Sequence, residues 1–380
     1  MPPEMSFRDR FLGTMEYQAV DRVPNHEAGV WPQTLARWQA EGMDPQVHSQ
    51  WWWFWGEEGF NLDPREYVQA DFQMLPPFER EVLAVTDEHE VVRHASGIVS
   101  KALLAGTVGG VRASMDQYLG WPVTDVASFR DLKKRYDPTD LARQPAGWRE
   151  NDLERWRTRS TVLTLGENCQ MKGFYWLARD WMGTENVSYA WYDQPELMHE
   201  MMEFIADFTI EVSRPFVEQI PFDYMFINED MAMKTGPLLG PGLYREFVLP
   251  HMRRLVEFFK QHGTRFVIVD SDGNTEPLIP LLIEAGVDGI WPLERASQDT
   301  DPVQLRRKYG RDLRLWGAVD KRELAKGRTA IDAHLRTFTS LIEEGGFIPT
   351  VDHLVPPDVS YDSFCYYMER KIELLRGDFR

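Results

Sequence analysis

The sequence predicts an α/β fold of the (β/α)8 TIM-barrel type, forming a single domain over residues 1–380 with irregular additions near the N-terminus. From residue 161 onwards, six short apolar runs alternate with helical segments across short linkers. Each apolar run ends in an ionisable residue, and glycine closes several of the helices. A barrel explains this pattern because all its strand ends face one mouth, whereas a doubly wound sheet forms a site only at its switch point.

The six strand–helix units run from residue 161 to the end of the chain. Short runs of branched and aromatic residues predict buried strands, and apolar residues spaced three and four apart predict amphipathic helices. Thr275 is the expected N-cap of one helix. The predicted strands span 162–165, 222–228, 265–269, 287–292, 312–318 and 347–351, and the main helices 195–218, 242–262, 276–284, 302–309, 330–344 and 361–376.

The first 160 residues are less regular. Residues 81–100 alternate as in a β-hairpin with its turn at Asp87 and Glu88. Extended pieces near Val23 and at 97–104 bring the expected number of barrel strands to eight. Helices are expected at 6–17 with Ser6 as N-cap, at 33–41, within 60–73, and at 126–136 with Asp125 or Ser128 as cap.

The composition excludes several classes of function. Asp and Glu outnumber Lys and Arg by 60 to 42, and this net charge of −18 argues against nucleic acid or an anionic membrane as a partner. Cys169 and Cys365 match no metal or redox spacing. No apolar run has the length of a signal peptide or a membrane helix, and no glycine-rich phosphate motif occurs. We therefore expect a cytoplasmic protein without a nucleotide cofactor.

The stretch 266–274, reading FVIVDSDGN, carries the most distinctive strand end. Asp270 and Asp272 share a face if the strand continues, and Gly273 permits a tight turn. Two buried carboxylates are costly without a purpose, although capping the next helix is an alternative that stays open. In a barrel they would share one mouth with the other strand-end residues, namely His26, Glu27, Glu167, Glu229, Asp230, Glu294, Asp320, Lys321, Asp352 and His353.

These residue types allow three kinds of chemistry. Asp272 and His353, with one or two further carboxylates, would form a site that suits zinc, manganese or iron. Crowded carboxylates raise one another's pKa, so that one of them can serve as an acid at neutral pH. Basic side chains at the mouth, Arg179 and Lys321, would receive a carboxylate or phosphate of the substrate.

Several segments resemble the uroporphyrinogen decarboxylase superfamily over most of the chain. They read RDRFLG at 8–13, DRVP at 21–24, GPLLGPGLYREFVLP at 236–250, DSDGN at 270–274 and GGFIPTVDHLVPPDV at 345–359. The resemblance implies a (β/α)8 barrel. It also implies an activity like that of the haem-pathway decarboxylases or of the methyltransferases that serve corrinoid proteins.

The chain departs from both branches of that superfamily. The decarboxylases carry an arginine-rich segment after the first strand, which holds substrate carboxylates. In this chain the equivalent residues 25–29 read NHEAG and contain no arginine. The carboxylates at the mouth would therefore repel an octa-acid porphyrinogen. Asp71 and His353 do resemble the decarboxylases' aspartate and histidine, and Asp230 lies in their strand-end segment. The methyltransferases bind zinc through His-x-Cys-Gly and a later cysteine, where this chain has DSDG at 270–273 and His353. Two expectations follow from the resemblance. One is a metal site with harder ligands, Asp272 with His353 and Asp230, Asp270 or Glu294. The other is a site that holds no metal and uses the carboxylates directly.

The leading expectation is an enzyme that carries out methyl transfer or demethylation of a small molecule, linked to a corrinoid protein. One alternative is a decarboxylase of uroporphyrinogen or a simpler carboxylic acid, and another is a non-catalytic tetrapyrrole or corrinoid binder that uses the Trp-rich residues 51–55. A homodimer is a further expectation. The expected catalytic residues are His353, Asp230, Asp272 and Asp71, and the expected substrate-binding residues are His26, Glu167, Arg179, Asn274 and Lys321.

Overall fold

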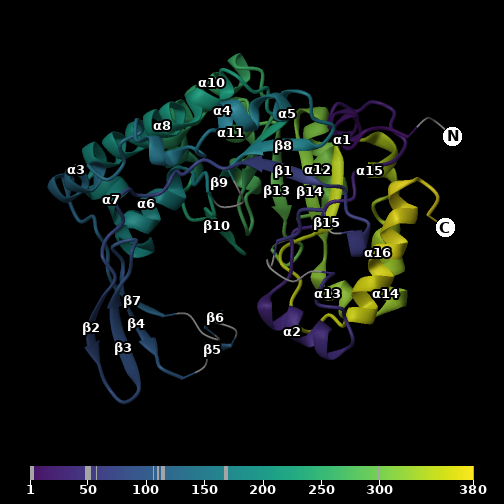
Figure 1. The fold of residues 1–380 in the computed structure, drawn as a ribbon, viewed down its shortest axis with the longest axis horizontal. Helices are drawn as coiled ribbons and strands as arrows, with labels where there is room; N and C mark the ends of the chain where they lie inside the picture. The colour runs from purple at the N-terminus through teal and green to yellow at the C-terminus, as the bar shows by residue number, and fades with distance from the viewer. Residues whose placement is uncertain are drawn as a thin grey trace.

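A curled parallel sheet of seven strands forms the centre of the protein in the computed structural model (Figure 1). The structure describes residues 4–47, 53–56, 58–105, 107–108, 111–112, 116–166, 170–297 and 300–379. The six strands predicted after residue 161 are all confirmed. In spatial order the sheet contains β1 (Arg65–Val68), β8 (Val162–Leu165), β9 (Tyr224–Asn228), β12 (Phe266–Asp270), β13 (Gly289–Leu293), β14 (Arg314–Val319) and β15 (Phe347–Val351).

The sheet is not closed by a continuous ladder, which corrects the prediction of a complete eight-stranded barrel. The extended segment 23–30 lies where the eighth strand would be, and within the described part of the chain a single parallel bridge, Val30 to Val355, ties it to the chain beyond β15. The Glu27 carboxylate accepts the Val351 N–H at 2.8 Å. A side chain thus takes a position that a strand carbonyl would take in a closed barrel.

Two N-terminal predictions are wrong. Part of the segment 60–73 forms strand β1, which pairs in parallel with β8, instead of a helix. The sequence does not reveal this strand, because Arg-Glu-Tyr-Val is only partly buried and lacks the apolar run of a central strand. Residues 97–104 do not join the barrel, since β4 pairs antiparallel with β3. The hairpin at 81–100 is confirmed as part of a separate sheet, in the order β2 (Glu81–Val85), β3 (His89–Arg93), β4 (Val99–Leu103) and β7 (Gln117–Gly120).

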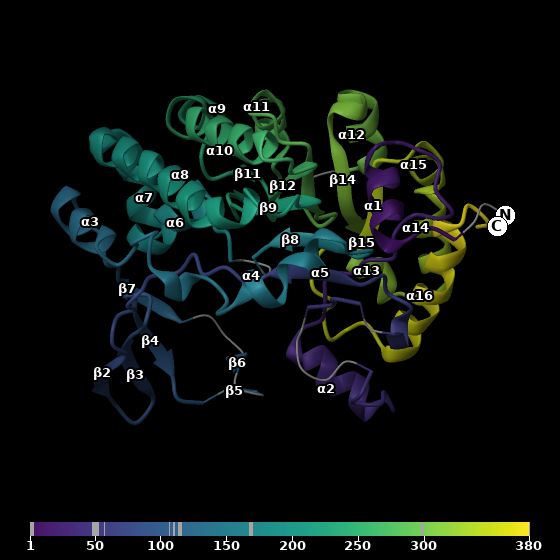
Figure 2. The ribbon, with the colours of Figure 1, turned by 45° about the horizontal axis from the view of Figure 1, so that its top comes forward.

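The predicted helices after residue 161 are present, some of them in two pieces. They surround the central sheet, while the antiparallel sheet and α2 project from the same side of the molecule (Figures 1 and 2). The bounds are α1 Phe7–Met15, α2 Pro32–Ala40, α3 Val126–Lys133, α4 Trp148–Asn151, α5 Leu153–Arg157, α6 Phe174–Met182, α7 Thr184–Asp193, α8 Pro195–Val217, α9 Pro241–Leu243, α10 Leu249–Gln261, α11 Ile279–Glu284, α12 Pro302–Tyr309, α13 Lys321–Leu324, α14 Arg328–Arg336, α15 Thr339–Glu344 and α16 Tyr361–Leu375.

Side-chain caps fix several helix starts. Ser6 Oγ accepts the Asp9 N–H at 3.1 Å, as expected for an N-cap. Asp125 and Ser128 form a reciprocal capping box at α3, so both predicted caps are used. Thr275 makes no capping hydrogen bond, contrary to prediction. The Asn274 side chain caps that turn instead, accepting the Glu276 N–H at 3.1 Å.

Aromatic rings fill the interior of the curled sheet. Phe11 of α1 packs against Tyr224, Phe266 and Trp316, with ring centroids 5.6–6.2 Å apart. Because Phe11 and these rings fill the interior, we expect a ligand to bind at the carboxyl ends of the strands. In the described part of the chain no helix is both long and apolar enough to cross a membrane.

Candidate active site at the carboxyl ends of the strands

Asp272 and His353 meet across the sheet, with His353 Nε2 lying 3.3 Å from Asp272 Oδ2. They follow β12 and β15, which are far apart in sequence, and meet because parallel strands end at the same edge. Their side chains remain 38% and 25% exposed. The ring of Trp31 lies 6.0 Å from that of His353. The pair is therefore preformed, yet open to a ligand.

Gly273 fixes the loop that carries Asp272. Its φ is +81°, and a Cβ there would lie 2.6 Å from the carbonyl oxygen of Ala232. Only glycine permits both the left-handed conformation and this close approach. The Asn274 N–H also donates to the Met233 carbonyl at 2.9 Å. The loop is thereby held against the segment that follows β9.

Asp270 ends β12 and points toward the neighbouring strand. Asn228 Nδ2 of β9 donates a hydrogen bond to its carboxylate, which is nearly buried. Burial, followed by the neighbouring Asp272 carboxylate, raises the pKa of Asp270 well above its usual range. Asp270 is therefore a candidate proton donor beside the Asp272–His353 pair.

Asp230 is held by Arg179 of α6. Arg179 donates to the Asp230 carboxylate at 2.7 Å and to its backbone carbonyl at 3.2 Å. Asp230 has a φ of +39°, a conformation that costs a non-glycine residue energy. The arginine compensates for this strain by fixing both groups, so its charge is already paired.

Glu229 joins α6 to β9. Its buried carboxylate accepts the Phe174 and Tyr175 N–H groups at 3.0 and 2.8 Å, the free donors at the start of α6. A Cβ at Gly173 would lie 2.3 Å from the Glu229 carboxyl carbon. Burial raises the pKa of Glu229 to about 7, against the opposing effect of the backbone hydrogen bonds. This contact sets where Arg179 lies.

Lys321 lies between two carboxylates. Its Nζ is 3.0 Å from Glu294 and 3.7 Å from Asp352. Asp352 is fully buried and accepts the Arg295 N–H at 2.8 Å. Burial raises the pKa of Asp352, while Lys321 opposes the shift. Neither Lys321 nor Arg179 thus offers an uncommitted charge to an anionic substrate.

Three further predicted residues, Asp71, Asn274 and His26, do not join this cluster. Asp71 follows β1 and accepts the Gln73 N–H at 2.7 Å, which shapes its own loop. Asn274 caps a helical turn, as described above. His26 lies inside the curled sheet between Phe11 and Trp316, and neither of its ring nitrogens has a hydrogen-bond partner among the described residues. Glu167 lies outside the described residues.

The predicted metal ligands converge only in part. Asp272 and His353 meet, but Asp270 turns to Asn228 and Glu294 to Lys321. Among the residues that the structure describes, no group of three or more His, Cys, Asp or Glu side chains could hold a metal ion. The donor set among these residues is thus incomplete for zinc. A divalent metal stays a prediction, which elemental analysis of the purified protein would test.

Two residues near the site, Asn228 and Trp31, were not predicted to belong to it. Asn228, the partner of Asp270, directly precedes Glu229 at the end of a predicted strand, so its position could have indicated a place in the site. Trp31, beside His353, lies after the irregular segment 23–30, and nothing local indicates its neighbour. Only the fold brings it to the carboxyl end of β15.

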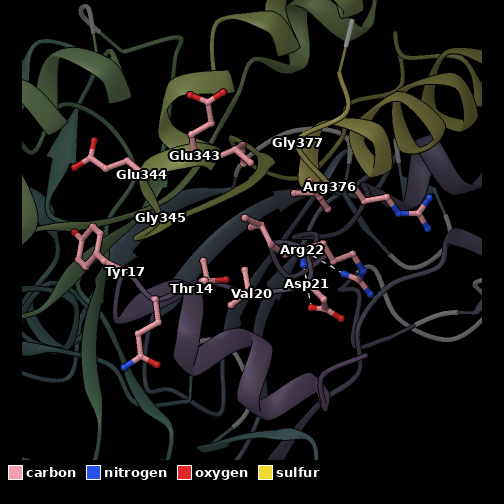
Figure 3. Close-up of a pocket in the computed structure, with 15 residues that line it drawn as sticks. Thr14, Tyr17, Val20, Asp21, Arg22, Glu343, Glu344, Gly345, Arg376 and Gly377 are labelled. Atoms are coloured by element: carbon pink, nitrogen blue, oxygen red, sulfur yellow. Dashed lines mark hydrogen bonds between the residues drawn. The ribbon is translucent and has the colours of Figure 1, made fainter. Parts of the chain in front are cut away.

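A separate cleft of about 360 Å³ lies near α1, the end of α15 and the C-terminal end of α16 (Figure 3). Two of its five charged lining residues, Asp21 and Arg22, are engaged in ion pairs: Arg10 binds Asp21 at 2.6 Å, and Asp63 binds Arg22. Such contacts at the amino-terminal end of a barrel support stability. The cleft is therefore not part of the candidate active site.

Comparison with known proteins gives a family and a fold. The family described as uroporphyrinogen decarboxylase (URO-D) matches residues 175–371, just over half of the chain. No match is found among curated proteins. Among solved structures, a methyltransferase from Methanosarcina mazei is similar with a TM-score of 0.58 and 14% sequence identity, over 99% of each chain. At this identity the likeness shows a shared fold.

Proposed function

Because the chain belongs to the uroporphyrinogen decarboxylase family, we propose that it is an enzyme that removes a methyl group from a small molecule and transfers it to a corrinoid protein. The observation that carries this proposal is the Asp272–His353 pair at 3.3 Å, which is open at the strand ends. Burial, followed by the Asp272 carboxylate, also raises the pKa of Asp270, two residues before Asp272. The similarity of the fold to a methyltransferase supports the same reaction class.

Residues of this chain would donate the proton that the demethylated atom of the substrate requires. When a methyl group leaves an oxygen, nitrogen or sulfur atom, that atom keeps the bonding electron pair and becomes basic. Asp270, whose pKa is raised, can supply a proton, and Asp272 orients the His353 ring through Nε2. Proton transfer by a positioned side chain contributes about 10²–10⁴-fold to a rate. The corrinoid, when bound, supplies the methyl acceptor.

Decarboxylation is the second candidate, and the family match favours it. A substrate carboxylate would need a basic partner at the mouth, yet Arg179 is paired with Asp230 and Lys321 with Glu294. A polycarboxylate would therefore meet excess negative charge. On this ground we place decarboxylation behind methyl transfer.

The test uses reduced cobalamin as the methyl acceptor and a panel of methyl ethers, methylamines and methyl thioethers as donors. Formation of methylcobalamin is followed by its absorbance. Asp272→Asn and His353→Gln are expected to lower the rate at least about 100-fold, because each disrupts the preformed pair. Asp207→Asn, which removes a surface carboxylate paired with Arg254, is the matched control and should retain the rate.

Full activity in both site variants would contradict the proposed roles of Asp272 and His353. Release of carbon dioxide from a carboxylic acid, without methyl transfer to any acceptor, would favour the second candidate.

A further inference from the structure

A second pocket, here called the rim pocket, lies where the turn between β3 and β4 meets α6. Its volume is about 250 Å³. Its walls come from Tyr136, from Leu177 and Trp181 of α6, and from Ala95 in the turn between β3 and β4. The N-terminal additions and the barrel therefore build it together. Neither Asp272 nor His353 lines it, so its ligand is distinct from the substrate of the proposed methyl transfer.

The aromatic walls are rigid. Trp181 Nε1 donates to the Tyr136 hydroxyl at 3.0 Å, and the two rings meet edge to face at 5.5 Å. Both residues are almost fully buried. Arg143 holds the neighbouring loop by donating to the carbonyls of Asp71 and Gln73 at 3.0 and 2.7 Å. A ligand would thus enter a largely preformed space, as is typical of small-molecule sites.

One ion pair supplies the polar end of the rim pocket. Lys172 Nζ lies 2.6 Å from Asp180 Oδ2, and the two side chains are 21% and 28% exposed. Lys172 has further N–H donors and Asp180 further lone pairs. The pair is neutral overall, because each charge lies against the other. An anionic ligand would be repelled by Asp180 and a cationic one by Lys172.

The shape and charge of the rim pocket define a ligand class. A water molecule takes about 30 Å³ of liquid, so the space corresponds to about eight waters, or to one ring with a short substituent. We propose that the rim pocket binds a small neutral molecule with an apolar ring and a head group that both accepts and donates a hydrogen bond. A primary carboxamide has this chemistry, with its oxygen toward Lys172 and its NH2 toward Asp180.

Benzamide is the probe, with benzoate and benzylammonium as its charged analogues of similar size. Titration calorimetry should give a millimolar Kd for benzamide, the range typical of so small a ligand. We expect benzamide to bind at least about tenfold more tightly than either analogue. Tighter binding of benzoate or benzylammonium, or no binding of benzamide at millimolar concentrations, would overturn the proposal.

Variants locate the site. Ala95→Trp places an indole at the exposed lip of the pocket and should abolish benzamide binding without changing Tm. Lys172→Met should weaken the binding of benzamide at least about tenfold. Benzylammonium should then bind more tightly than benzamide, because Asp180 has lost its lysine partner. Lys326→Met removes a lysine from a similar pair, 2.6 Å from Glu323, and serves as the matched control. Unchanged benzamide affinity in Ala95→Trp would show that the probe binds elsewhere.

Discussion

At the scale of single residues, long-range partners decide what each ionisable group can do. Asp270 and Asp272 are two positions apart, yet one is buried against Asn228 and the other is open beside His353. The first therefore favours its protonated form, while the second orients a ring. Lys321 and Arg179 were expected to receive a substrate anion, but each already binds a carboxylate of the chain.

His26 gives a prediction for pH dependence. Burial, followed by the charges of Arg65 and Lys371, lowers the pKa of His26 well below its usual value of about 6.5. Below pH 6.5 the unfolded chain binds the proton and the folded chain does not, so folding stability falls as the pH falls. The expected slope is up to about 1.4 kcal/mol per pH unit for this residue.

Urea unfolding of the wild type and of His26→Leu at pH 7.5 and pH 5.5 measures this effect. The leucine variant should lose less stability on acidification, because it has no proton to bind. Equal losses in both proteins would contradict a buried, neutral His26.

At the scale of elements, short contacts lock the helices onto the strand ends. The start of α6 is the clearest case, since Gly173, Glu229 and the first N–H groups of the helix interlock. This contact places Arg179 over Asp230 on one face of α6, and Leu177, Asp180 and Trp181 beside the rim pocket on another. One helix thus serves both the candidate active site and the second pocket.

Gly173→Ala tests this interlock. The added methyl group would overlap the Glu229 carboxyl group, so we expect a loss of about 1–3 kcal/mol in unfolding free energy. The control is Gly242→Ala in α9, where no atom lies within 4 Å of the added Cβ, and its stability should stay equal or rise slightly. Equal effects of the two substitutions in denaturant titrations would contradict the proposed packing.

At the scale of the whole molecule, Glu27 connects the two ends of the chain. Its buried carboxylate accepts hydrogen bonds from Val351 N–H of β15 and from Tyr367 and Lys371 of α16. This cluster holds the segment 23–30 at the open edge of the sheet. A charged side chain thus takes over part of the function of the missing strand ladder.

Glu27→Ala should therefore lower the unfolding free energy by about 3–5 kcal/mol, because it leaves the buried Lys371 charge without its carboxylate partner. Combining it with Lys371→Met should recover part of that loss. Glu323→Ala, which breaks the pair with Lys326, is the control and should cost less than about 1 kcal/mol. A small effect of Glu27→Ala in equilibrium unfolding would show that the sheet holds without this cluster.

The sequence by itself determined the local elements and the end of the sheet where the candidate site lies. Six strands, most of the helices, and the placing of Asp272 and His353 at strand ends followed from hydrophobic period and turn residues, because these act between near neighbours. Local patterns did not locate β1, whose short sequence has no apolar run, nor exclude 97–104 from the central sheet. Only the tertiary structure decided which carboxylate binds which cation, that Trp31 lies beside His353, and that the sheet stays open. These outcomes depend on contacts between residues that are far apart in the chain, and the spacing of residues in the sequence does not determine the distances between them.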